Sequence, residues 1–220
     1  DVCSSDLRQR TGIEQRHWVD VDSSTCTSDL ALEASLKALD AAKVKKEDLD
    51  MIILGTLTPD CEFPGTACFL QAKLGVSGIA ALDIRQQCSG FIYGMSIADQ
   101  FIRTGTKKHV LVVGAEIHSK ALDRTTRGRE VSVLFGDGAG AVVMGSIEAG
   151  DEDQKSARVY STHLHADGSF AEELWIPAPG TRFRNARINH AMLDERMHFP
   201  KMNGKTVFVN ATKRMSECVL

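Results

Sequence analysis

The stretch IAALDIRQQCSGFIYGMSIADQFIRTGTKKHVLVVGAE, residues 79–116, decides the fold class. It begins with a short apolar run at 79–84, continues with apolar residues at helical spacing over 89–105, and closes with a second apolar run at 109–116. Short continuous apolar runs are typical of buried strands, and a helix between two of them connects parallel strands. The stretch therefore predicts a strand–helix–strand unit whose helix ends at Gly105.

The same alternation extends toward the N-terminus. Residues 28–44, SDLALEASLKALDAAKV, predict a helix with Ser28 as its N-cap, and three leucines at helical spacing support it: Leu32, Leu36 and Leu39. Residues 49–58, LDMIILGTLT, predict a buried strand, and residues 65–75 predict a helix that ends at Gly75. Strands that alternate with helices of this length predict an α/β fold with helices on its sheet.

Toward the C-terminus the pattern is less regular. Residues 133–145, VLFGDGAGAVVMG, predict a glycine-rich strand, and we attribute its glycines to close packing of the backbone. Residues 148–156 have the composition of a surface loop, and residues 157–169 predict one more strand. Two further segments follow, an irregular surface region at 175–205 and a helix that begins near Asn203 or Gly204.

Composition limits the classes of function. The chain has 220 residues, 43% of them hydrophobic and 25% charged, which is typical of a globular protein with a substantial core. A net charge of −3 gives no electrostatic attraction for nucleic acid. No apolar run approaches the roughly 18 residues of a membrane span, and no signal peptide is visible. We therefore expect small-molecule chemistry in the cytoplasm, without nucleic acid or membrane.

The cysteines point to one candidate nucleophile. The six cysteines stand at irregular spacings without a Cys-x-x-Cys pair, so we expect no metal site and no disulfide framework. Cys88 differs because it lies between a predicted strand and a predicted helix, where α/β proteins gather ligands. The N–H groups of a helix N-terminus can stabilise a thiolate or a developing oxyanion. From its position alone, Cys88 could equally be a nucleophile or a buried structural thiol.

Seven segments, in order, resemble the β-ketoacyl-acyl-carrier-protein synthase III family. They are RTGIEQRHW, TPDCEFPGTACFLQAKLG, DIRQQCSGFIYGMSIADQFI, VLVVGAE, RGREVSVLFGDGAGAVVMG, STHLHADGS and MNGKTVFVNA. The resemblance implies a thiolase-like fold, with helices layered around a mixed β-sheet in duplicated halves. It makes residues 8–150 the N-terminal half with the nucleophilic cysteine. Residues 151–220 become a connecting region and the incomplete start of the second half, and residues 1–7 do not look like family sequence.

The resemblance also implies an activity. Cys88 matches the family's nucleophile, which takes an acyl group from acyl-coenzyme A as a thioester and passes it to malonyl-acyl carrier protein with decarboxylation. A homodimeric acyltransferase of fatty-acid synthesis is thus expected, with no cofactor, since acyl-coenzyme A is a substrate. Alternatives are a related enzyme of secondary-metabolite or long-chain ketone synthesis, an acyl-thioester transferase or hydrolase without condensation, and a non-catalytic partner subunit.

Six further residues match binding positions of the family. Phe63 matches an aromatic that reaches across the family's dimer interface to close the partner's acyl pocket. The others match contacts to coenzyme A: Arg10 and Thr11, then Arg127 with Gly128 beside the adenine, and Phe208 along the pantetheine channel. A guanidinium suits such a place because it can pair with phosphate and stack on a base.

The sequence also departs from the family pattern. The family's catalytic histidine lies in a His-Gln-Ala-Asn motif and its asparagine precedes Thr-Ser, and neither motif occurs in these 220 residues. Asp6 stands where many members have a tryptophan that stacks on adenine. We therefore expect a copy truncated at both ends, which can be acylated at Cys88 but is inactive in condensation.

Overall fold

A computed structural model describes residues 8–9, 11–147, 157–184 and 186–219. The chain divides into two compact units. The first, called the sheet unit below, consists of residues 22–117 and 137–164. The second unit takes the residues before Asp22, residues 118–136 and the residues after Leu164.

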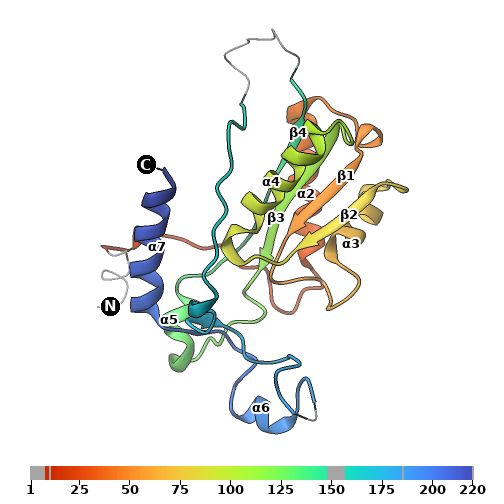
Figure 1. The fold of residues 1–220 in the computed structure, drawn as a ribbon. Coiled ribbons are helices and arrows are strands. Elements are labelled where there is room, and N and C mark those ends of the chain that lie inside the picture. The colour runs from red at the N-terminus through yellow and green to blue at the C-terminus, as the bar shows by residue number, and fades with distance from the viewer. Residues whose placement is uncertain (1–7, 10, 148–156, 185, 220) are drawn as a thin grey trace. The chain divides into compact units, whose positions relative to one another are not determined.

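The sheet unit is built on four strands in the order β2-β1-β3-β4 (Figure 1). Strand β1 (Met51–Gly55) pairs in parallel with both β2 (Ala80–Ile84) and β3 (His109–Ile117). Strand β4 (Asp137–Gly145) runs antiparallel to β3. The sheet is therefore mixed, as the resemblance implied, and the strand–helix–strand unit predicted for residues 79–116 is confirmed.

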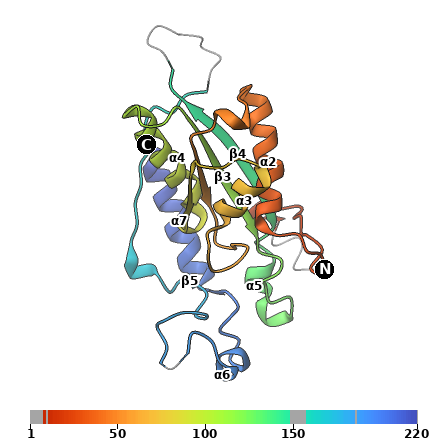
Figure 2. The same cartoon turned by 90° about the vertical axis from the view of Figure 1, so that its right-hand side faces the viewer.

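Helices cover both faces of this sheet (Figure 2). Helices α2 (Thr27–Ala42) and α3 (Thr66–Leu74) pack on one face, and α4 (Gly90–Arg103) packs on the other. Successive residues of β1 alternate between the two resulting cores, because Ile52 contacts the first and Ile53 the second. Burial on both faces explains why β1 and β3 read as continuous apolar runs.

Two strand predictions need correction. Residues 80–84 do form a strand, but β2 is the edge of the sheet; two of its five residues are exposed and none is buried. Residues 157–169 form no strand in the described part of the chain; a 3-10 turn occupies Gly168–Phe170 at their end. A strand exists only with a hydrogen-bonded neighbour, and alternation along one segment does not supply one. The loop predicted at 148–156 lies outside the described residues.

The predicted ends of α3 and α4 are confirmed, but the predicted start of α2 is not. Gly75 caps α3 with φ 70° and Gly105 follows the C-cap of α4 with φ 71°, so both predicted stops are confirmed. The predicted N-cap of α2 is wrong, because Cys26 occupies that position. Ser28 lies inside the first turn instead, and its N–H donates to Asp60 at 2.9 Å.

The face of α2 toward the sheet also differs from the leucine pattern. Leu39 is buried, but Leu36 is 47% exposed, and the small side chains of Ala31 and Ser35 lie fully buried in its place. The hydroxyl of Ser35 donates to the carbonyl of Ala31 at 2.6 Å, which satisfies this polar group inside the core. Small residues on the buried face allow α2 to lie close to the sheet.

In its described residues, the second unit contains little regular structure apart from its last helix. Its short elements are 3-10 turns at Thr126–Gly128 and Gly168–Phe170, α5 (Arg129–Ser132), α6 (His190–Asp194), and the two-residue antiparallel strands β5 (Leu174–Trp175) and β6 (Lys201–Met202). Helix α7 (Gly204–Val219) begins where the sequence predicted. Across the described residues, no helix combines the length and apolar character that crossing a membrane requires.

Candidate active site around Cys88

Cys88 lies in a tight turn between the edge strand β2 and helix α4. The turn is a 3-10 helix over Gln87–Ser89, and α4 begins at the next residue. Gln87 has φ 36°, in the left-handed region that residues other than glycine rarely adopt, which costs on the order of 1–3 kcal/mol. Ser89 occupies the N-cap of α4 but makes no capping bond with its side chain. The N–H of Gly90, the first of α4, donates to the carbonyl oxygen of Gln87, so a ligand beside the thiol would use the N–H groups that follow it in the first turn.

A row of three glycines crosses the sheet at the level of this turn. Gly55 at the end of β1 is in register with Gly114 of β3, which is in turn in register with Gly140 of β4. Residues that are directly opposite across neighbouring strands project to the same face of a sheet. Because all three residues lack a side chain, the backbone of three strands lies bare at this level.

Two of these glycines allow the approach of α4, and the third leaves open space. A Cβ on Gly55 would lie 2.9 Å from the carbonyl carbon of Gly90, and a Cβ on Gly114 would lie 3.4 Å from the ring of Phe91. A Cβ on Gly140 or on Gly138 would meet no atom within 4 Å. The interpretation of the 133–145 glycines as close-packing residues is therefore wrong for these two positions.

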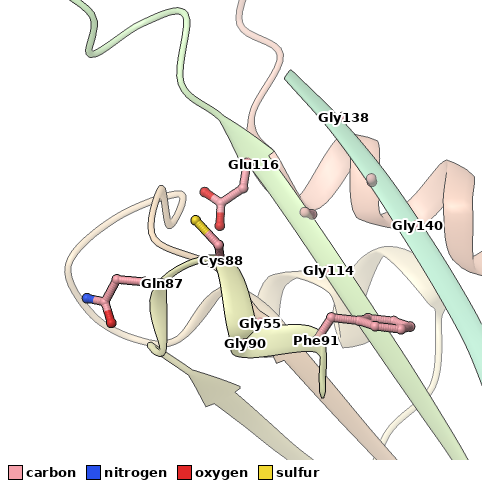
Figure 3. Close-up of a pocket in the computed structure, with 11 residues that line it drawn as sticks. Gly55, Gln87, Cys88, Gly90, Phe91, Gly114, Glu116, Gly138 and Gly140 are labelled. Atoms are coloured by element: carbon pink, nitrogen blue, oxygen red, sulfur yellow. The ribbon is translucent and has the colours of Figure 1, made fainter. Parts of the chain in front are cut away.

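The bare backbone and the Cys88 turn line an open cavity of about 220 Å³ (Figure 3). This volume is below the roughly 300–1,000 Å³ of typical drug-sized ligand sites, and it suits a small acyl group. The lining residues come from the ends of β1, β3 and β4 and from the start of α4: Gly55, Gln87, Cys88, Gly90, Phe91, Gly114, Ala115, Glu116, Gly138, Ala139 and Gly140.

Glu116 is the charged residue of this cavity, and sequence reasoning missed it. Its two carboxylate oxygens accept hydrogen bonds from the N–H of Leu57 at 2.8 Å and from the hydroxyl of Thr58 at 2.7 Å. In Figure 3 the carboxylate and the thiol of Cys88 point toward one another. The sequence feature that could have identified it is a single acidic residue after an apolar stretch, near the carboxyl end of a predicted strand. Ligand sites of α/β proteins usually lie at the carboxyl ends of strands.

Phe63 belongs to the sheet unit but does not line the cavity. It lies in the loop between β1 and α3 and is 80% exposed. The loop is fixed at its far end by Asp83 of β2, which accepts hydrogen bonds from the N–H groups of Thr66 at 2.6 Å and Ala67 at 2.7 Å. That Phe63 closes the acyl pocket of a partner subunit remains a prediction.

The remaining predicted binding residues belong to the second unit, except for Arg10, which lies outside the described residues. Thr11 accepts a hydrogen bond from the N–H of Ile13 at 3.2 Å, and Arg127 is exposed in its 3-10 turn. Gly128 admits no side chain, because a Cβ would lie 2.1 Å from the carbonyl oxygen of Asp123. Phe208 is 62% exposed on α7, which is compatible with a ligand contact and not with a core position.

Comparison with known proteins places these features in a family context. Residues 82–168, which include Cys88, Glu116 and β4, match the family model of 3-oxoacyl-[acyl-carrier-protein] synthase III. A β-ketoacyl-[acyl-carrier-protein] synthase III of Caldanaerobacter subterraneus is 44% identical over 100% of this chain and 62% of the relative.

Solved structures agree with the sequence relatives. A 3-oxoacyl-(acyl carrier protein) synthase III of Pseudomonas aeruginosa superimposes with a TM-score of 0.80 at 32% identity, over 98% of this chain and 60% of that chain. The corresponding protein of Aquifex aeolicus gives 0.75 at 38% identity, over 93% and 57%. The chain thus spans about three-fifths of the length of these relatives.

Proposed function

We propose that this chain, which is similar to 3-oxoacyl-[acyl-carrier-protein] synthases III, is part of such an enzyme and carries its acyl-accepting site. In this proposal the acyl group of an acyl-coenzyme A moves to Sγ of Cys88. The enzyme then joins this group to malonyl-acyl carrier protein with loss of carbon dioxide, which initiates fatty-acid synthesis. The observation that carries the proposal is the thiol of Cys88 in the glycine-walled cavity at the N-terminus of α4.

The geometry supports the acyl-transfer step. Sγ of Cys88 attacks the thioester carbonyl, and the N–H groups of the first turn of α4 stabilise the negative charge that develops on the carbonyl oxygen. The carbon–sulfur bond to coenzyme A then breaks, and the coenzyme A sulfur takes up the proton that the thiol of Cys88 lost. The open space over Gly138 and Gly140 receives the acyl group.

The other parts of the proposal rest on the family. Coenzyme A would contact Arg10, Thr11, Arg127, Gly128 and Phe208, and the exposed guanidinium of Arg127 suits a phosphate or an adenine ring. Phe63 would close the acyl pocket of a partner subunit in a homodimer, and its exposure supports such a contact. The proposed enzyme works in the cytoplasm and needs no cofactor besides its coenzyme A substrate.

Acylation of the chain tests the proposal directly. The 220-residue chain is incubated with radiolabelled acetyl-coenzyme A, and the labelled peptide is identified by mass spectrometry. We expect label on the peptide that contains Cys88, none in Cys88→Ser, and unchanged labelling in Cys61→Ser, which removes an exposed thiol outside the cavity. Label on another cysteine, or none in the parent chain, would overturn the assignment.

Release of carbon dioxide separates condensation from simple acyl transfer. Because these 220 residues lack the two family motifs that assist decarboxylation, we expect acylated Cys88 without release of carbon dioxide from malonyl-acyl carrier protein. Carbon dioxide release by this chain would contradict that expectation. Rapid appearance of free acetate, in place of stable label, would favour the thioester hydrolase.

A further inference from the structure

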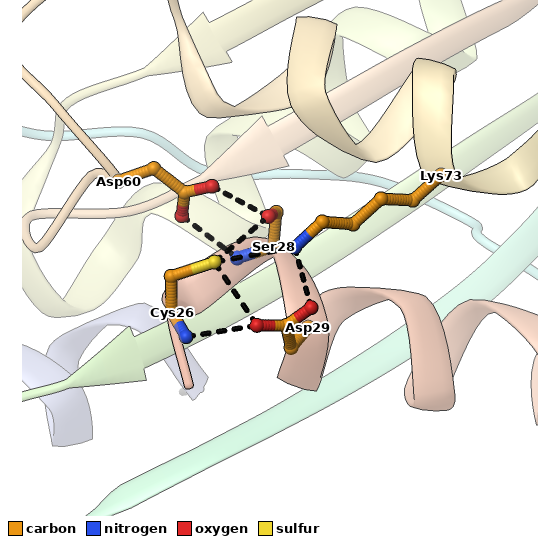
Figure 4. A network of polar contacts seen from close by, with 5 residues as sticks. All are labelled: Cys26, Ser28, Asp29, Asp60 and Lys73. Carbon is orange, nitrogen blue, oxygen red and sulfur yellow. Dashed lines mark hydrogen bonds and ion pairs between the residues drawn. The ribbon is translucent and has the colours of Figure 1, made fainter. Parts of the chain in front are cut away.

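A second group of polar side chains surrounds the thiol of Cys26, on the sheet face that carries α2 and α3. Figure 4 shows this thiol at the N-terminus of α2, with the side chain of Lys73 reaching it from the last turn of α3. Three polar atoms lie within hydrogen-bonding distance of Cys26 Sγ: Lys73 Nζ at 3.2 Å, Asp29 Oδ2 at 3.1 Å and Ser28 Oγ at 3.3 Å. Cys26 is half-buried and the Lys73 side chain is 31% exposed, so small molecules can reach both.

Helix capping alone gives no reason for a sulfur atom at this position. Cys26 is the N-cap of α2, where Ser, Thr, Asp and Asn are preferred because a side-chain oxygen accepts the free N–H groups of the first turn. Asp29 supplies the reciprocal bond, since its carboxylate accepts the N–H of Cys26 at 2.9 Å. A sulfur beside an amine has a redox chemistry that a hydroxyl oxygen lacks.

The nitrogen of Lys73 is at reacting distance from this sulfur. Atoms in near-attack arrangements are about 3–3.5 Å apart, and Lys73 Nζ lies 3.2 Å from Cys26 Sγ. Asp29 holds the amine in place through an ion pair while it also accepts the thiol hydrogen of Cys26. Among the cysteines that the structure describes, only Cys26 has a sulfur with a hydrogen bond to lysine; the others are Cys61, Cys68, Cys88 and Cys218.

We propose that Cys26 and Lys73 form a reversible oxidative crosslink, with hydrogen peroxide as the oxidant. In the first step the thiol attacks peroxide, the O–O bond breaks, and the products are a sulfenic acid on Cys26 and one water. Sulfur loses two electrons and peroxide gains them. In the second step the neutral amine of Lys73 attacks sulfur, the S–O bond breaks, and hydroxide leaves with a proton from the amine as a second water. Two equivalents of a thiol reductant restore both side chains and become a disulfide.

The charges around the site set the pH dependence of the second step. Burial alone would lower the pKa of Lys73, but the hydrogen bonds to Asp29 and Cys26 outweigh burial and raise this pKa above 10.5. Lys73 is therefore protonated at neutral pH and must release a proton before it attacks. Sulfenic acid should accumulate first, and the crosslink should form faster as the solution becomes more alkaline.

Peptide mapping of the oxidised chain tests the crosslink. The chain is treated with hydrogen peroxide, free thiols are alkylated, and trypsin digestion is followed by mass spectrometry. We expect a linked pair of peptides that contains Cys26 and Lys73, lacks cleavage after Lys73, and weighs two hydrogen atoms less than the sum of its parts. Dithiothreitol should abolish the linked pair.

Matched variants separate the crosslink from simple oxidation. Lys73→Arg keeps a positive charge for Asp29 but has a poor nucleophile, so its sulfenic acid on Cys26 should persist and react with dimedone. Lys73→Gln is a second amine-free variant in case the first misfolds, and Cys26→Ser should give no linked pair. Circular dichroism verifies that each variant folds.

Three outcomes would overturn the proposal. The first is equal dimedone labelling of Cys26 in the parent chain and in Lys73→Arg, with no linked pair in either. The second is a linked pair that retains an additional oxygen, which would indicate an N–O–S bridge and not a direct S–N bond. The third is a disulfide between Cys26 and another cysteine.

Discussion

Replacement of Gly55 by alanine tests whether the Cys88 turn depends on direct contact between two backbones. A Cβ at residue 55 would lie 2.9 Å from the carbonyl carbon of Gly90 and 3.2 Å from both the oxygen of Gly90 and the nitrogen of Phe91. All three atoms belong to the backbone at the start of α4, so no flexible side chain can move aside. The helix N-terminus must shift away from the sheet, and the turn that carries Cys88 must shift with it.

The magnitude follows from two opposing effects. Overpacking of this kind typically costs about 1–3 kcal/mol. Replacing glycine by alanine in a strand raises the free energy of unfolding by about 0.5–1 kcal/mol, because alanine loses less backbone freedom than glycine when the chain folds. We therefore expect Gly55→Ala to lower the free energy of unfolding by about 1 kcal/mol, and by about 2.5 kcal/mol at most. Gly138→Ala is the matched control, since it lines the same cavity but its Cβ meets no atom within 4 Å; this variant should gain up to about 0.5–1 kcal/mol.

Urea unfolding followed by circular dichroism measures both changes, and alkylation of Cys88 by iodoacetamide reports on the site. In Gly55→Ala the alkylation rate of Cys88 should change. The alkylation rate of Cys61, a thiol remote from the cavity, should not. If Gly55→Ala resisted urea as well as Gly138→Ala does, the contact between β1 and the start of α4 could not be what positions Cys88.

Three further predictions concern the polar groups that hold the sheet unit together. Asp83→Ala removes the carboxylate that accepts the first N–H groups of α3, so we expect a loss of about 0.5–2 kcal/mol in urea unfolding. Hydrogen bonds, above all the one from Lys73, lower the pKa of Asp29 from 3.8 to about 2. A carboxyl with a lowered folded-state pKa stabilises the fold above its unfolded value, so stability should fall as pH drops from 3.8 to about 2, and fall less in Lys73→Met. Glu116→Gln can keep the bond from the N–H of Leu57 but weakens the one from Thr58, so we expect a loss of about 1–3 kcal/mol and a changed rate of Cys88 acylation.

The central strands and the stops of the helices were predictable because their causes are local. A strand buried on both faces must be apolar at every position, and Met51–Gly55 satisfies this condition within five residues. A helix that ends in the left-handed conformation requires a residue such as Gly75, which is visible in the sequence. For Cys88, the strand-to-helix junction was predictable for the same reason, because the apolar runs on either side define it.

The remaining features depend on contacts between distant segments. Residues 157–169 have the composition of a strand, but pairing requires a partner that no local pattern supplies. Ser28 has a suitable side chain for an N-cap, yet its backbone N–H donates to Asp60, which is distant in sequence. Cys26 occupies the N-cap position instead. The proximity of Cys26 to Lys73 likewise arises only when α2 and α3 pack on the same face of the sheet.

The row of three glycines across the sheet combines a local sequence feature with contacts between distant segments. Gly55, Gly114 and Gly140 are far apart in sequence, and each one alone would weaken its strand, because glycine has no side chain to pack. Once register places them side by side, the first two allow α4 to approach the sheet and the third leaves space for a ligand. The absence of these three side chains thus determines both the position of the Cys88 turn and the volume of the cavity beside it. A methyl group at residue 140 should therefore narrow the cavity and, as at residue 138, raise the free energy of unfolding by up to about 0.5–1 kcal/mol, whereas the same group at residue 55 should lower the free energy of unfolding and displace the Cys88 turn.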